Sequence, residues 1–137
     1  MAALEPGGGV VVAGSTYSDR WPTTQGALKA TKTSSSTDQV GMVARLGPAG
    51  QKLVASTYFG GSRVDLITAL ALDPDGSIVV AGYSGSQDLP LTPDALRTAF
   101  VKDEGFVARL RPDLTGIEYS SYVGGNSSDR VHALAVP

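Results

Sequence analysis

Residues 67–83 read ITALALDPDGSIVVAGY, and this stretch decides the fold. Residues 67–72 are a short apolar run, and it ends at DPDG, where proline followed by Asp-Gly is a strong turn signal. Residues 77–83 are rich in β-branched side chains, which favour strands. The tight spacing of the two runs predicts an antiparallel hairpin whose first strand is buried on both faces.

A second hairpin follows in the sequence. Residues 105–110 and 117–122 are further apolar runs, separated by the turn sequence RPDLTG. The four predicted strands form an antiparallel meander. On the long connection between the hairpins, Thr92 is placed to cap a helix and Pro93 would take its first position, so we expect one helical turn there.

The same pattern occurs twice in the chain. VAG at residues 12–14 returns at residues 80–82, an offset of 68 residues, whereas VARL at residues 43–46 returns at residues 107–110, an offset of 64. The first copy therefore has extra residues, and they fall in the polar stretch 29–39. We expect this stretch to be a surface loop that tolerates insertion.

A four-stranded unit that is apolar on both faces cannot bury them alone and must stack against copies of itself. This is the physics of a β-propeller blade, and known propellers close with about four to eight blades. The sequence thus predicts an all-β fold of two propeller blades per chain, completed by strand exchange into a ring or a filament.

The order of motifs resembles the SBBP repeat, the bacterial seven-bladed β-propeller repeat. The matching strings are YFGG (58–61), DPDG (73–76) leading to VVAGY (79–83), LPLTPDA (89–95) and GFVARL (105–110), with WPTT (21–24) in the first copy. The resemblance implies a propeller in an exported or surface-associated bacterial protein, extracellular or on the cell surface, without an assigned catalytic role. It does not fix the ring size, because whole copies of a two-blade chain cannot give seven blades.

The phase of the repeat divides the chain into three parts. Residues 1–66 form a first blade that lacks most of its inner strand, residues 67–128 form the second blade, and residues 129–137 repeat the inner strand. Residues 1–9 have no basic stretch followed by an apolar one, so no secretory signal is expected in this sequence. An apolar edge at each end is an aggregation hazard unless another strand pairs with it.

We therefore hypothesise strand exchange, in which residues 131–136 of one subunit add beside residues 9–14 of the next. Closed rings would need about two, three or four chains, and a head-to-tail join that does not close gives a filament. The alternative is that the chain is part of a longer propeller protein whose neighbouring blades supply these strands. The expected assembly residues are Val10, Val11, Val12, Val131, His132, Ala133, Leu134, Ala135 and Val136.

Composition excludes several other classes. A formal charge of -2 with 11 basic and 13 acidic residues argues against a nucleic-acid or anionic-membrane surface. No apolar run approaches the roughly 20 residues of a membrane span. There is no cysteine and one histidine, which rules out disulfides, thiolate catalysis and cysteine- or histidine-dominated metal sites. No catalytic motif is present, so we expect neither an enzyme nor a cofactor.

Binding residues are expected on the long loops, which we place at one end of the strands. The candidates are Arg20, Trp21, Arg63, Asp65, Asp88, Asn126 and Asp129, with Asp19 and Gln87 beside them.

Each candidate has a purely structural alternative. Asp65 and Asp129 occupy one repeat position, where a short carboxylate either accepts backbone N–H bonds in the turn or contacts a ligand or metal. Trp21 is matched by Leu89, so packing at a blade seam competes with a sugar-stacking role. His132 lies in the repeated inner strand and is expected to be packed or to line a channel.

Three functions from different classes follow. The first is a noncatalytic structural and binding module that assembles head to tail as a homo-oligomer and presents its loops to a glycan or protein. The second is a carbohydrate-binding propeller lectin, which would need an aromatic platform in each blade. The third is an enzyme fragment with an active site in the channel, which would need polar groups converging there from several blades.

Overall fold

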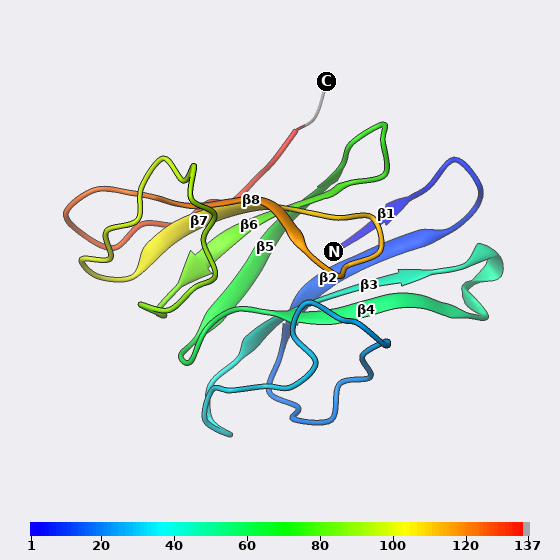
Figure 1. Cartoon of the computed structure of the whole chain (residues 1–137), viewed down its shortest axis with the longest axis horizontal. Helices are drawn as coiled ribbons and strands as arrows, with labels where there is room; N and C mark the ends of the chain where they lie inside the picture. The colour runs from blue at the N-terminus through cyan, green and yellow to red at the C-terminus, as the bar shows by residue number, and fades with distance from the viewer. Residues whose placement is uncertain (136–137) are drawn as a thin grey trace.

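The computed structural model describes residues 1–135 and is all-β, with two four-stranded antiparallel sheets (Figure 1). Both sheets are meanders, so the predicted four-stranded unit is confirmed. A 3-10 turn (η1, Pro48–Gly50) joins the last two strands of the first sheet. The first sheet contains β1 (Ala2–Leu4), β2 (Val10–Thr16), β3 (Val40–Leu46) and β4 (Leu53–Phe59), and the second contains β5 (Asp65–Leu72), β6 (Ile78–Ser84), β7 (Glu104–Leu110) and β8 (Ile117–Val123).

The two sheets repeat each other in register. Val11 pairs with Arg45 in the first sheet, and their repeat equivalents Val79 and Arg109 pair in the second. The predicted turn after β5 is confirmed as well, because the Gly76 N–H donates to the Asp73 carbonyl at 2.9 Å. Gly76 has a φ of +89°, a left-handed conformation that favours glycine.

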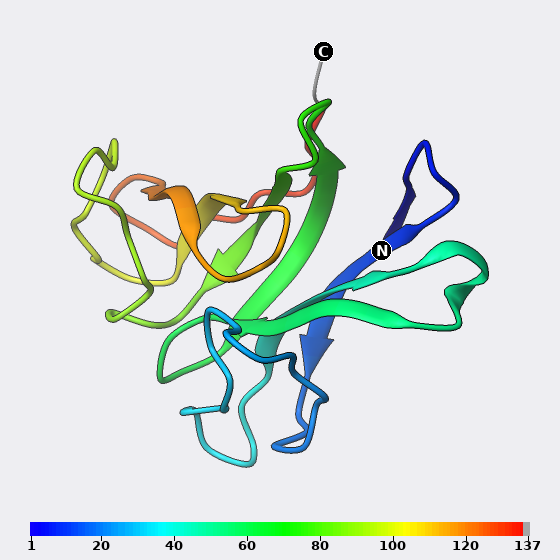
Figure 2. The same cartoon turned by 45° about the vertical axis from the view of Figure 1, so that its right-hand side comes forward.

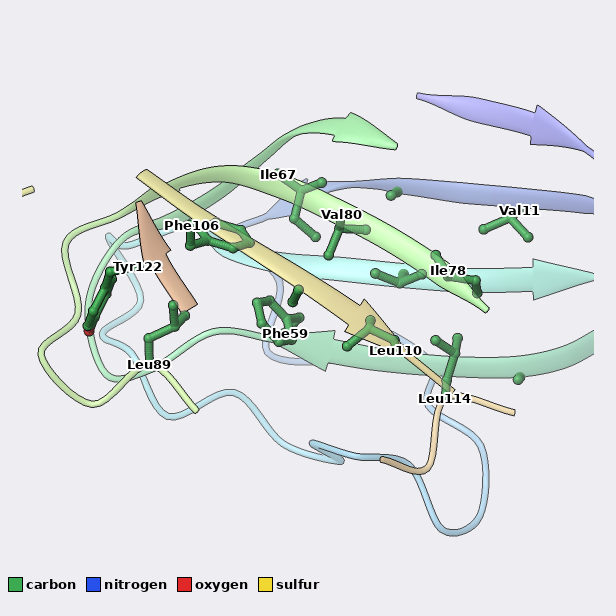
Figure 3. Packing of buried hydrophobic residues seen from close by; sticks show 14 residues of the cluster. Val11, Phe59, Ile67, Ile78, Val80, Leu89, Phe106, Leu110, Leu114 and Tyr122 are labelled. Atoms are coloured by element: carbon green, nitrogen blue, oxygen red, sulfur yellow. The ribbon is translucent and has the colours of Figure 1, made fainter. Parts of the chain in front are cut away.

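The hydrophobic core lies between the two sheets (Figure 3). Val11 and Phe59 project from the first sheet, and Val80, Phe106 and Leu110 from the second; all five side chains are completely buried. The rings of Phe59 and Phe106 meet with centroids 5.5 Å apart, within the range that aromatic pairs prefer. Each sheet therefore buries one face against the other.

The predicted helical turn at residues 92–97 is wrong. The Ala95 N–H donates to the Thr92 carbonyl in a simple turn, and no α-helix occurs between residues 1 and 135. The Thr92 hydroxyl cannot cap a helix because it accepts the N–H of Ser120 in β8, while the Thr92 N–H donates to the Ser120 carbonyl.

Both long connections lie along an outer strand. The β2–β3 connection (blue to cyan in Figure 1) runs beside β4, where Thr24 bonds to Ser56 and the Lys29 carbonyl accepts the Tyr58 N–H. The equivalent bonds join the β6–β7 connection to β8. Residues 29–39 form part of a loop, as predicted, but the middle of each connection shields a sheet edge instead of standing free at the ends of the strands.

The expectation that the β5 strand is buried on both faces is also wrong. Ile67 and Ala69 are buried, but Thr68 is exposed and Leu70 is only partly buried. The register of β5 against β6 shifts between Ile67 and Ala69, so a bulge places Thr68 outside the ladder. Within residues 1–135, the first sheet covers one side of β5 and no further sheet covers the other.

The C-terminal segment stays against the second sheet and forms no strand over residues 129–135 (Figure 2). The Val131 N–H donates to the Gly82 carbonyl at 3.2 Å, and the Thr68 hydroxyl donates to the Val131 carbonyl. Val136, an expected assembly residue, lies outside the described residues. Within residues 1–135, no helix is long and apolar enough to cross a membrane.

Candidate functional site

Asp65 is the most buried candidate residue, and it joins the two sheets. Its side chain is fully inaccessible, and its carboxylate accepts hydrogen bonds from the Gly61 N–H at 2.8 Å, the Ser84 hydroxyl at 2.5 Å and the Ser86 hydroxyl at 2.8 Å. Burial raises the pKa of Asp65, although the three donors oppose that effect. The predicted acceptance of a backbone N–H in the turn is confirmed.

Arg63 and Asp88 lie beside Asp65, as loops from the two sheets meet there. The Asp88 carboxylate accepts the N–H and the hydroxyl of Ser62, and the Arg63 N–H donates to the Ser86 hydroxyl. Burial acts against ionisation of Asp88, but the bonds from Ser62 outweigh it and the pKa of Asp88 is lowered. The structure thus brings three candidate residues together in a junction that satisfies its own polar groups.

Asp129 repeats the backbone half of this junction. Its carboxylate accepts the Gly125 N–H at 2.8 Å, and its own N–H donates to the Asp103 carbonyl at 2.9 Å. The Asp65 N–H donates to the Gln39 carbonyl at 3.0 Å in the same way. No hydroxyl group of residues 1–135 donates to Asp129, so the second half of the junction is not supplied within the described chain.

Equivalents of the hydroxyl donors that Asp129 lacks are present on the first sheet. Thr16 and Ser18 are the repeat equivalents of Ser84 and Ser86. The Ser18 N–H donates to the Thr16 hydroxyl at 3.0 Å, and the Ser86 N–H donates to the Ser84 hydroxyl at 3.1 Å. Ser18 is exposed and Thr16 is partly exposed, whereas Ser84 and Ser86 are fully buried.

A pair of arginines shows the same asymmetry at the opposite end of the strands. Arg45 of β3 forms an ion pair with Glu5 at 2.8 Å and donates to the carbonyls of Pro112 and Gly76 in the second sheet. Its repeat equivalent Arg109 contacts only carboxylates of its own sheet, including Asp73 at 2.9 Å. Arg45 therefore bridges the sheets, and Arg109 faces the side of the second sheet that no further sheet covers within residues 1–135.

The two outward faces of the chain show the same difference between repeat-equivalent residues, which are buried between the sheets and more exposed on the outside. Val43 and Phe59 face the second sheet and are fully buried, but their equivalents Val107 and Val123 on the second sheet are partly buried and 39% exposed, respectively. Conversely, Ile78 is fully buried and its equivalent Val10 on the first sheet is only partly buried. Each outward face thus repeats the apolar pattern of a face that is buried between the sheets.

Trp21 is held by the first sheet. Its indole N–H donates to the Ser56 hydroxyl at 2.9 Å, and its backbone N–H donates to the Tyr58 hydroxyl at 2.9 Å. Leu89 is buried at the equivalent position, beside Tyr122. Burial raises the pKa of Tyr122 to about 12. The indole N–H of Trp21 therefore already has a hydrogen-bond acceptor within the chain.

The remaining candidates are not gathered at one place. Arg20, Gln87 and Asn126 are exposed on three separate loops, and Asp19 is exposed next to Arg20. His132 is exposed and not packed, and the segment that contains it crosses the second sheet. Val10, Val11 and Val12 pair with β1 in the first sheet, and Ala133, Leu134 and Ala135 belong to the C-terminal segment.

Several clefts lie on the surface of the chain, in different places. One of about 200 Å³ lies between the two sheets and is lined by Lys29, Tyr58, Phe59, Gly60 and Asp88 among others. Another, of about 380 Å³, is lined by residues around Glu5, Arg45 and Pro48 at the opposite end of the strands. Ligand pockets usually enclose about 300–1,000 Å³, so the cleft between the sheets is smaller than such a pocket and the second one is within the range. Within residues 1–135, no group of three or more histidine or acidic side chains is arranged to hold a metal ion.

No protein-family model matches the chain, and a search of curated proteins finds no match. Sequence reasoning missed Ser84, Ser86 and Arg45 as functional residues. The signal for the first two was present, since hydroxyl residues flank one position at both residues 84–86 and residues 16–18.

Proposed function

We propose that this chain is a noncatalytic β-propeller repeat module, similar to SBBP repeats, that assembles head to tail with further copies of itself. The single observation that carries the proposal is the repeat relation between the faces. The outward face of the second sheet has the pattern of the inward face of the first, and the converse also holds.

A neighbour that fits one outward face must present the pattern of the other. Val107 needs a partner surface like the one that covers Val43, and the first sheet of another copy offers it through Val10 and Val12. Burying apolar area contributes about 25 cal/mol per Å², and open apolar faces of this kind favour association. Because the contact is heterologous, copies close into a ring or extend as a filament.

The module would present the strand ends near Asn126 and Arg20 to a glycan or protein partner. We place it in an exported or surface-associated protein, following the family that the sequence resembles. A carbohydrate-binding role has less support, because the Trp21 indole bonds to Ser56 and the second repeat has Leu89 at that position. Binding on a glycan array that Trp21→Ala abolishes would favour the lectin instead.

Light scattering after size exclusion tests the assembly. We expect oligomers whose mass is a multiple of the chain mass, and Val107→Lys on the outward face of the second sheet should convert them to folded monomers. Val12→Lys should do the same from the opposite face. Val101→Lys on an exposed loop is the matched control and should leave the mass unchanged. A folded wild-type monomer at several hundred micromolar would refute the proposed function.

A further inference from the structure

The junction around Asp65 specifies where a second copy must bind. Three donors hold this carboxylate, one from its own turn and two from Ser84 and Ser86 of the second sheet. Asp129 has the turn donor, Gly125, and lacks the hydroxyl donors. Thr16 and Ser18 hold the same mutual geometry as Ser84 and Ser86 and are accessible.

We propose that residues 129–135 of one copy enter the first sheet of a second copy, with Asp129 accepting hydrogen bonds from the hydroxyls of Thr16 and Ser18 of that copy. The inference rests on the proposed function. It adds the pairing register of the incoming segment with β2, the hydrogen bonds of Asp129, and the displacement of β1. The incoming occupant is a second copy of this chain, because such a copy carries the repeat complement of both elements.

The register follows from β5. In β5, Asp65 pairs with Ser84, Leu66 with Tyr83 and Ile67 with Gly82. The repeat equivalents put Asp129 opposite Thr16, Arg130 opposite Ser15 and Val131 opposite Gly14 of the second copy. These three β2 positions have no ladder partner on the side where β1 lies, because β1 pairs only with Val10, Val11 and Val12.

β1 occupies the rest of this edge of β2, so it must be displaced by the incoming segment. Met1 exchanges two hydrogen bonds with Ala13, and Ala2 and Ala3 pair with Val12 and Val11. The repeat places Ala133, Leu134 and Ala135 at these positions, so the exchange replaces small and apolar residues by similar ones. The three new pairs at residues 129–131 and the Asp129 bonds must therefore outweigh the bonds of Val131 to Gly82 and Thr68 that the segment makes within its own chain.

Glu104 makes an unfilled Asp129 junction unfavourable. The Glu104 side chain is fully buried, and its Oε2 atom has no hydrogen-bond partner. A Cβ built on Gly124 would lie 2.3 Å from that oxygen and 2.6 Å from Oδ2 of Asp129, so the two carboxylates flank one glycine. The guanidinium of Arg97 is the positive group beside them, 3.6 Å from the Oε1 atom of Glu104. Hydroxyl donors from a second copy would supply the polar contacts that Asp129 lacks.

Cysteine cross-linking tests the register, since the chain has no cysteine of its own. Ser15→Cys and Arg130→Cys are prepared as separate full-length chains and mixed under mild oxidation. We expect a disulfide-linked dimer from this pair. The matched control replaces Arg130→Cys by Ala135→Cys, whose repeat position is opposite Val11, and should cross-link at least about tenfold more slowly.

Substitution of the polar contact is the second measurement. Asp129→Ala should weaken association about tenfold to a hundredfold, as expected for loss of hydrogen bonds to a charged group. Thr16→Val should weaken it similarly, and the double variant should be no weaker than the stronger single one. Removal of residues 1–4 should tighten association, because β1 no longer competes.

The outcomes separate the two proposals. Assembly that persists without Ser15–Arg130 cross-linking, or with affinity unchanged by Asp129→Ala, would overturn this inference and leave the assembly function standing. A monomer in every preparation would overturn both. Cross-linking in the expected pair together with coupled effects at Asp129 and Thr16 would support the inference even if one substituted chain proved unstable.

Discussion

Replacing Asp65 by alanine tests whether the inter-sheet junction stabilises the chain. The substitution removes three hydrogen bonds and leaves the Gly61 N–H and the hydroxyls of Ser84 and Ser86 buried without this acceptor. An unpaired buried donor costs about 1–3 kcal/mol. The Ser84 hydroxyl has the Ser86 carbonyl at 3.5 Å as a weaker acceptor, and loss of the buried charge offsets part of the cost.

The net loss of unfolding free energy should therefore be about 2–4 kcal/mol, a large effect for one residue. Urea unfolding followed by circular dichroism measures it, at a concentration where light scattering shows the chain to be monomeric. Asp129→Ala is the matched control, because it occupies the same repeat position and loses only the bond from Gly125. It should cost under about 1 kcal/mol in the monomer. Equal effects of the two substitutions would refute the reasoning.

Three further predictions concern stability. Arg45→Met should destabilise the monomer by about 1–3 kcal/mol, because it breaks bonds between the sheets, and Arg109→Met should have a smaller effect; urea unfolding of both variants checks the order. Deleting residues 34–37, between Lys29 and Gln39 whose carbonyls bond to the strands, should change the unfolding free energy by less than about 0.5 kcal/mol in the same assay. The raised pKa of Asp65 means that the folded state binds its proton more tightly than the unfolded state, so its contribution is present at low pH and declines as pH rises through the folded pKa. The stability of wild type relative to Asp65→Asn should therefore fall as pH rises from about 4, the usual pKa of aspartate, and a difference that grows with pH would contradict this assignment.

The strands of both sheets were predictable because the sequence is locally consistent. The DPDG turn and the β-branched run after it agree with the pairing of β5 and β6. Repeat phase located β2, β3 and β4 of the first sheet. It predicted that the first blade lacks most of its inner strand, and the structure shows the three-residue β1 at that position. Propensity and periodicity were sufficient wherever a segment pairs with its neighbours in sequence.

The errors came from contacts between segments far apart in sequence. Thr92 has the right neighbours for a helix cap, but its hydroxyl bonds to Ser120, which is 28 residues away. For Trp21, the sequence offered packing at a blade seam or a sugar-stacking role, and it could not identify Ser56 as the partner of the indole N–H. A bulge between Ile67 and Ala69 leaves Thr68 exposed and outside the ladder, and no residue pattern marks it.

The candidate site was predictable in position and only partly in chemistry. The repeat identified Asp65 and Asp129 as equivalent residues, and the turn bond to each carboxylate is confirmed. Their hydroxyl partners were missed because Ser84 and Ser86 belong to a different sheet from the turn that contains Gly61. Such a pairing depends on how two repeats dock, which a single repeat cannot reveal.

The differences between equivalent residues argue that the two junctions have different strengths. Within the chain, two apolar residues, Val40 and Phe59, accompany the polar junction around Asp65, and both are fully buried. At the outward face, the equivalents are Glu104 and Val123, so a charged group replaces an aliphatic one and a smaller side chain replaces an aromatic ring. An aromatic pair contributes about 0.5–1.5 kcal/mol beyond its buried area, and a buried carboxylate opposes burial unless polar groups satisfy it. The outward junction must therefore be the weaker of the two, which means that an assembly of copies would separate there before either pair of sheets came apart.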